Sequence, residues 1–161
     1  MWSQQAAGTW HTLVMAQNPI RNLDWRKWFD QMLPQTLQVA TWLLYINGAF
    51  AILDWIDRSD IYGIWRWYGG IGGVIAPFAC LSYVAAGLLM ANGRRLGWHL
   101  AIAASLSPVA LRALLKFQHE TGLPLSWVLT QRNLISFLFE AALVALLLHP
   151  MSRTHAARWF R

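Results

Sequence analysis

Four long apolar stretches, residues 37–56, 70–91, 96–115 and 133–149, restrict what this chain can fold into. A helix needs about 20 mostly apolar residues to cross the hydrocarbon core of a bilayer. Three of the stretches have this length, and the fourth falls a little short of it. Only 12% of the residues are charged, whereas soluble domains average about 25%. The sequence therefore predicts an all-α integral membrane protein, a four-helix bundle.

The links between the stretches divide the chain into three parts. Residues 1–36 form an N-terminal segment, residues 37–149 a membrane domain with four spans, and residues 150–161 a basic tail. The second and third spans are joined by residues 92–95 alone, so we expect them to be antiparallel neighbours. The fourth span is short, and it would fit a thinned bilayer or stand with little tilt.

The 13 Lys and Arg residues are unevenly distributed between the two sides of the predicted bundle. Eight lie on the side of the chain ends: Arg21, Arg26, Lys27, Arg94, Arg95, Arg153, Arg158 and Arg161. The other side has Arg58, Arg66, Lys116 and Arg132, with Arg112 close by. Because cytoplasmic loops are enriched in Lys and Arg, this bias predicts that both termini are cytoplasmic.

The net charge of +6 suggests anionic lipid as the counterion. The basic residues lie beside the apolar stretches and are not interleaved with exposed aromatics along one helix, as a nucleic-acid surface would require. The 11 tryptophans agree with a membrane, since indole favours the boundary between headgroups and acyl chains. The predicted partner is thus the lipid bilayer, and no nucleic acid is expected.

Residues 22–33 have the periodicity of an amphipathic helix. Their apolar residues follow the spacing of one helical face: Trp25, Trp28, Phe29, Met32 and Leu33. Tryptophan on one face and basic residues on the other are typical of a helix in the membrane interface. We therefore predict an N-terminal interfacial helix over this range, and the alternative is a helix packed on a partner protein.

Small residues recur along the second span at alternating steps of four and three. This helix-packing seam consists of Gly69, Gly73, Ala76, Cys80, Tyr83 and Gly87. Helices in lipid associate through small residues, because these let two backbones approach closely. The seam therefore predicts a contact with another helix.

An arginine inside the third span, Arg112, indicates where polar groups meet in the membrane. Arginine keeps its proton in proteins, and exposing it to hydrocarbon costs at least about 2.5–3.5 kcal/mol. The fourth span contains one acid, Glu140, at a depth that a long side chain can reach. The sequence predicts that Arg112 and Glu140 form an ion pair.

Further polar residues are expected at the same depth, in the outer half of the bilayer. The predicted polar cluster is Asn47, Asp54, Arg112, Asn133, Ser136 and Glu140. One interpretation is a helix contact that fixes register, and the other is a site for a solute, a proton or a lipid headgroup. Two acids against one arginine leave an excess negative charge, which suits a cation or a proton.

The sequence contains no pattern of a catalytic site. It has no glycine-rich phosphate loop before a helix and no HExxH motif, and no serine has a histidine at an obvious triad depth. His99 and His149 lie near the cytoplasmic interface and could in principle hold haem or a metal. Solitary interfacial histidines are commoner, so no catalytic residue, metal or other cofactor is predicted, and an enzyme is not favoured.

The junction NGRRLGWHLAIA, residues 92–103, resembles the basic, tryptophan-containing turn of small four-helix bacterial inner-membrane proteins. This resemblance implies a multi-pass protein of the bacterial cytoplasmic membrane and implies no activity. Two functions remain. The first is a structural or accessory subunit that associates with other membrane proteins or with itself, as the seam suggests. The alternative is a small transporter, or a component that binds a solute, lipid or proton in the polar cluster.

Overall fold

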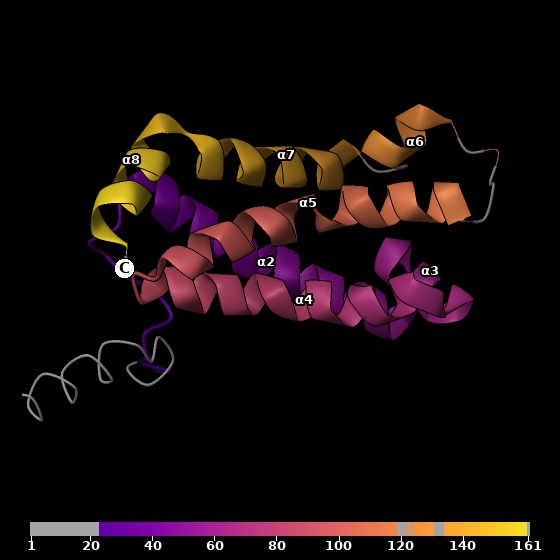
Figure 1. The fold of residues 1–161 in the computed structure, drawn as a ribbon, viewed down its shortest axis with the longest axis horizontal. Helices are drawn as coiled ribbons and strands as arrows, with labels where there is room; N and C mark the ends of the chain where they lie inside the picture. The colour runs from indigo at the N-terminus through magenta and orange to yellow at the C-terminus, as the bar shows by residue number, and fades with distance from the viewer. Residues whose placement is uncertain (1–22, 119–121, 123, 131–133, 161) are drawn as a thin grey trace, which may run out of the picture.

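The computed structural model describes residues 23–118, 122, 124–130 and 134–160. All regular structure in these residues is helical, and they contain no strand (Figure 1). The helices, labelled as in the figure, are α2 (Gln35–Asp57), α3 (Asp60–Tyr68), α4 (Gly70–Ala91), α5 (Arg95–Gln118), α6 (Leu125–Thr130), α7 (Leu134–Leu148) and α8 (Pro150–Trp159).

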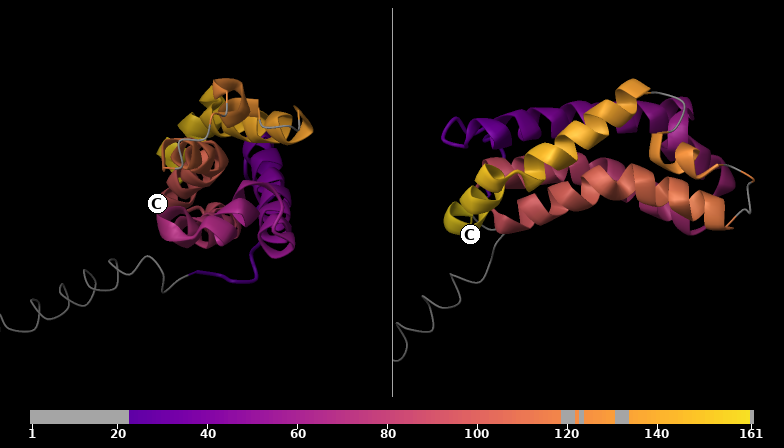
Figure 2. Two further views of the ribbon diagram at one scale, coloured as in Figure 1. Left: turned by 90° about the vertical axis from the view of Figure 1, so that its right-hand side faces the viewer. Right: turned by 90° about the horizontal axis from the view of Figure 1, so that it is seen from above.

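The four long helices α2, α4, α5 and α7 form an antiparallel bundle. Viewed end-on they form a ring in which α2 contacts α4 and α7, and α5 contacts the same two helices (Figure 2). One end of the bundle, the α8 end, holds the start of α2, the turn between α4 and α5, and α8. The opposite end, the α3 end, holds α3 and α6 (Figure 1).

Three helical segments are long and apolar enough to cross a membrane: Gln35–Tyr68, Gly70–Ala91 and Arg95–Gln118. A fourth crossing arises if α7 and α8 count as one span bent by 52°. Within an apolar stretch of 18 residues in each segment, 28%, 50% and 39% of the stretch is buried inside the protein. Their outward surfaces are apolar, as the exposed Phe78 and Val74 of α4 illustrate. Such surfaces need lipid to cover them, as expected of a membrane protein.

The predicted spans agree with the helices of the bundle. Residues 37–56 and 96–115 lie inside α2 and α5, and residues 70–91 are α4 itself. The fourth stretch contains α7, and its first residue, 133, lies outside the described residues. With 15 residues, α7 is about 22 Å long, which is shorter than the hydrocarbon core of about 30 Å.

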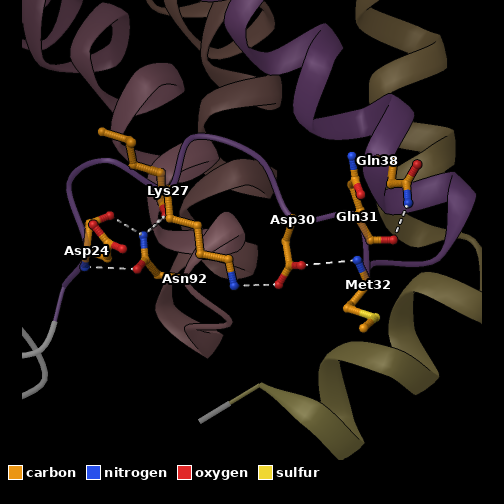
Figure 3. A network of polar contacts seen from close by, with 8 residues as sticks. Asp24, Lys27, Asp30, Gln31, Met32, Gln38 and Asn92 are labelled. Atoms are coloured by element: carbon orange, nitrogen blue, oxygen red, sulfur yellow. Dashed lines mark hydrogen bonds and ion pairs between the residues drawn. The ribbon is translucent and has the colours of Figure 1, made fainter.

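The predicted interfacial helix over residues 22–33 is wrong. Residue 22 lies outside the described residues, and residues 23–34 form turns and irregular structure. Side chains compete for the backbone there: the Asp24 carboxylate accepts a hydrogen bond from the Arg26 N–H, and Asp30 accepts one from the Met32 N–H. Such local bonds offer the backbone an alternative to a helix. Asn92 holds the segment from outside through two bonds with the backbone of Asp24 (Figure 3).

The five apolar residues of this segment consequently do not share one helical face. Leu33 is buried in the core, and Phe29 is half-buried with its ring 5.8 Å from that of Trp42. Trp25, Trp28 and Met32 are exposed. The backbone carbonyl of Trp28 accepts a 2.8 Å hydrogen bond from the Tyr45 hydroxyl on α2. The segment thus lies against the bundle at the α8 end.

The small-residue seam of α4 is filled by helices of the same chain. Ala76, Cys80, Tyr83 and Gly87 are buried, and the Cys80 thiol lies 3.4 Å from the Ala51 carbonyl oxygen of α2. A Cβ added at Gly87 would lie 2.5 Å from the ring of Tyr45, and one at Gly73 would lie 3.1 Å from the carbonyl oxygen of Trp65 on α3. Gly69 caps α3 in a left-handed conformation that favours glycine.

Candidate functional site

Arg112 of α5 and Glu140 of α7 form an ion pair inside the bundle. The two terminal nitrogens of Arg112 each contact one Glu140 oxygen, at 2.7 Å and 3.3 Å. This two-pronged geometry matches the planar guanidinium to the planar carboxylate and is stronger than a single contact. The Arg112 side chain is 1% exposed and that of Glu140 is 15% exposed. The structure therefore contains the pair inferred from the sequence, with the arginine fully enclosed.

Glu140 also faces a cavity of about 440 Å³ near the α3 end of the bundle. All the long helices contribute to its wall, and α3 folds back to join them. The polar lining consists of Asn47, Asp54, Ser59, Asp60, Tyr62, Tyr83, Ser136 and Glu140. The apolar lining consists of Phe50, Ala51, Pro108, Ile135 and Phe139. We call this space the acidic cavity, because three carboxylates line it.

The structure brings together most of the residues that the sequence placed at one depth. Asn47, Asp54, Ser136 and Glu140 line the acidic cavity. Arg112 does not line it, and instead holds Glu140 from the buried side of the wall. Asn133 lies outside the described residues.

Four polar residues of the lining were not predicted from the sequence. Ser59, Asp60 and Tyr62 belong to the link between the first two spans, which gave no sign of folding back on the bundle. Ser59 followed by Asp60 is a typical start of a helix, which is a signal for α3 but not for its direction. Tyr83 was assigned to the packing seam, and its side chain is part of the cavity wall as well.

Hydrogen bonds hold the cavity wall in place. The Tyr62 hydroxyl lies 3.1 Å from the Ser107 hydroxyl of α5, and the Trp65 indole N–H donates to the Leu111 carbonyl, also of α5. These bonds attach α3 to the bundle. The Ser59 hydroxyl donates to the Asp54 carboxylate at 3.0 Å, which orients that carboxylate beside the cavity.

Two buried nitrogens in this region have no hydrogen-bond partner among the described residues. They are the side-chain amide nitrogen of Asn47, which lines the cavity, and Nε of Arg112. Buried polar atoms in folded proteins nearly always have a partner. A donor without a partner in the wall of a cavity therefore indicates room for water or for a ligand that accepts a hydrogen bond.

The two candidate ligand histidines lie at the α8 end. His99 is exposed in the first turn of α5, where its ring packs edge-on against that of Trp98 at 5.0 Å. His149 is the N-cap of α8, and its Nδ1 accepts a hydrogen bond from the Met151 N–H. Over the described ranges, no group of three or more His, Cys, Asp or Glu residues is placed to hold a metal ion.

Comparisons with known proteins do not assign the chain to a family. No family model, curated protein or solved structure matches it. The acidic cavity itself is therefore the basis on which a function can be argued.

Proposed function

We propose that this protein binds a small organic cation in the acidic cavity, as a solute-binding or transport component of a membrane. The observation that supports this proposal is the lining, in which the carboxylates of Asp54, Asp60 and Glu140 stand among aromatic side chains. Carboxylates attract a positive charge, and the faces of aromatic rings attract it too, especially where water is excluded. This combination suits an ammonium group.

The charge balance favours a cation over an anion. Among the described residues, Arg112 is paired with Glu140, which balances the charge of that carboxylate. Asp54 adds a further negative charge to the lining, where it accepts a hydrogen bond from the neutral Ser59 hydroxyl. In a medium of low dielectric constant an excess of negative charge is costly, and a bound cation would offset it.

The size of the cavity favours an organic ion. Ligand pockets for small molecules occupy about 300–1,000 Å³, and the acidic cavity at about 440 Å³ lies in that range. The rings of Phe50, Phe139 and Tyr62 line it and can pack against the carbon atoms of such a ligand. An organic cation would thus cover the apolar surface of these rings with its carbon atoms and neutralise the carboxylates with its charge.

The Lys and Arg bias supports an orientation with both termini in the cytoplasm, which would put the acidic cavity in the outer half of a bacterial cytoplasmic membrane. A cation would then enter from the outer face. The other candidate function, an accessory subunit, has less support from the structure, because the seam that suggested a partner packs against α2 and α3 of the same chain.

Replacing Asp54 with asparagine is expected to weaken cation binding about tenfold, because loss of one charged contact of about 1.4 kcal/mol changes a dissociation constant by that factor. The measurement is isothermal titration of the full chain in mild detergent with tetramethylammonium. Asp57→Asn is the matched control, since Asp57 is exposed on the same helix and does not line the cavity.

The wild-type protein and the Asp57→Asn variant should bind tetramethylammonium equally and should not bind the uncharged molecule tert-butanol. The proposal fails if the wild type does not bind the cation, or if Asp57→Asn weakens binding as much as Asp54→Asn does.

A further inference from the structure

A second cavity lies at the α8 end, between the first turn of α5 and α8, and has a volume of about 620 Å³. The side chains that determine its chemistry are Arg95, Trp98, His99, Arg153, Thr154 and Arg158. We call this space the basic groove. It is separate from the acidic cavity, and none of these residues belongs to the polar cluster predicted from the sequence.

Three guanidinium groups share the basic groove, and no acid among the described residues lines it. Arg95, Arg153 and Arg158 are exposed, and none of them forms an ion pair within the described part of the chain. Arg95 donates a 3.0 Å hydrogen bond to the Ala157 carbonyl, which fixes the start of α5 to α8. The groove thus carries three positive charges, and the hydrogen bond from Arg95 holds its two helices together.

The backbone of α5 adds to the preference for an anion. This helix begins at the groove, at Arg95, whereas at the start of α8 Pro150 has no N–H and the Met151 N–H donates to His149. The first N–H groups of a helix lack partners within the helix and carry a partial positive charge. Guanidinium groups and helix N-termini both bind phosphate in many proteins.

In a membrane, the position of Trp98 would set the groove at the level of lipid headgroups. Its half-buried indole N–H donates to the Leu147 carbonyl near the end of α7. The ring therefore lies at the level where α5 begins and α7 ends. Tryptophan concentrates at this boundary in membrane proteins. Basic pockets between helices at this level are suited to anionic headgroups.

We propose that the basic groove binds a phosphate group, carried by an anionic phospholipid headgroup or by a soluble phosphate. Arg153 and Arg158 of α8 and Arg95 of α5 would contact its oxygens, and His99 would add a hydrogen bond. This inference is independent of the acidic cavity, because it concerns the opposite end of the bundle.

The test compares the wild type with the double variant Arg153→Gln/Arg158→Gln, using the full chain in mild detergent. Native mass spectrometry measures retention of phosphatidylglycerol and of phosphatidylcholine, and isothermal titration measures binding of inorganic phosphate. The charge-matched control is Arg58→Gln/Arg66→Gln, which removes two exposed arginines near the α3 end.

We expect the wild type and the control to retain phosphatidylglycerol over phosphatidylcholine, and the groove variant to bind it at least about tenfold more weakly, since each basic residue contributes about 1 kcal/mol to binding at an anionic surface. If the wild type also binds inorganic phosphate and the groove variant does not, the ligand includes soluble phosphate. If the groove variant loses binding of phosphatidylglycerol and the wild type does not bind inorganic phosphate, the ligand is a lipid headgroup. Equal binding by both double variants, or equal retention of the two lipids, overturns the proposal.

Discussion

Replacing Glu140 with leucine is expected to destabilise the bundle by about 3–5 kcal/mol, the usual result of breaking a buried ion pair from one side. Arg112 is 1% exposed and would keep its charge with its carboxylate partner removed. The reverse change, Arg112→Leu, should cost less, because Glu140 is 15% exposed beside the cavity and can be neutralised by a proton. Unfolding of the two variants in mild detergent measures this asymmetry.

Exchanging the charges should restore much of the lost stability. Arg112→Glu and Glu140→Lys are each expected to disable the protein, and the double variant should recover. The pair Lys27–Asp30, with N and O 2.7 Å apart and side chains 41% and 22% exposed, is the comparison nearer the surface. Its disruption by Asp30→Asn should cost no more than about 1 kcal/mol, since ion pairs that water reaches contribute little. Absence of rescue, or equal costs for the two pairs, would argue against a structural role for the buried pair.

Replacing Gly97 with valine is expected to separate α4 from α5 and to cost about 2–3 kcal/mol, as overpacking of a buried contact does. A Cβ at Gly97 would lie 2.6 Å from the backbone nitrogen of Met90. A backbone atom cannot turn away as a side chain can, so the two helices have to move apart at the turn that joins them.

The control for this substitution is Ala103→Val on the exposed face of the same helix. It introduces the same side chain into α5 without meeting a neighbouring helix. Thermal unfolding should show a loss for Gly97→Val and almost none for Ala103→Val. Similar unfolding of both variants would mean that α4 and α5 do not pack closely at this turn.

The long helices could be predicted because their signal is local. A run of about 20 apolar residues is typical of a membrane-spanning helix, and the bounds of α4 follow from its flanking glycines and from Asn92. The depth of Arg112 and Glu140 could be predicted as well, since it depends only on the distance of each residue from a helix end.

Other features depend on contacts between distant segments, which periodicity does not contain. Residues 22–33 have an amphipathic spacing, yet the carboxylates of Asp24 and Asp30 and the amide of Asn92 hold the described part in turns. The return of α3 toward the cavity requires Arg58 in a left-handed conformation and the bond from Trp65 to α5. Likewise, small residues predict close packing of α4, but not that α2 and α3 are the helices that fill its seam.

The locations of the two chain ends test most directly whether all four long helices cross the bilayer. α2 begins and α7 ends at the same end of the bundle, so an even number of crossings puts both termini on one face (Figure 1). Reporters that are active on only one side of the membrane, fused to the N-terminus or to the C-terminus, measure this. Both fusions are predicted to report the cytoplasm, and reporters on opposite faces would contradict a four-span bundle.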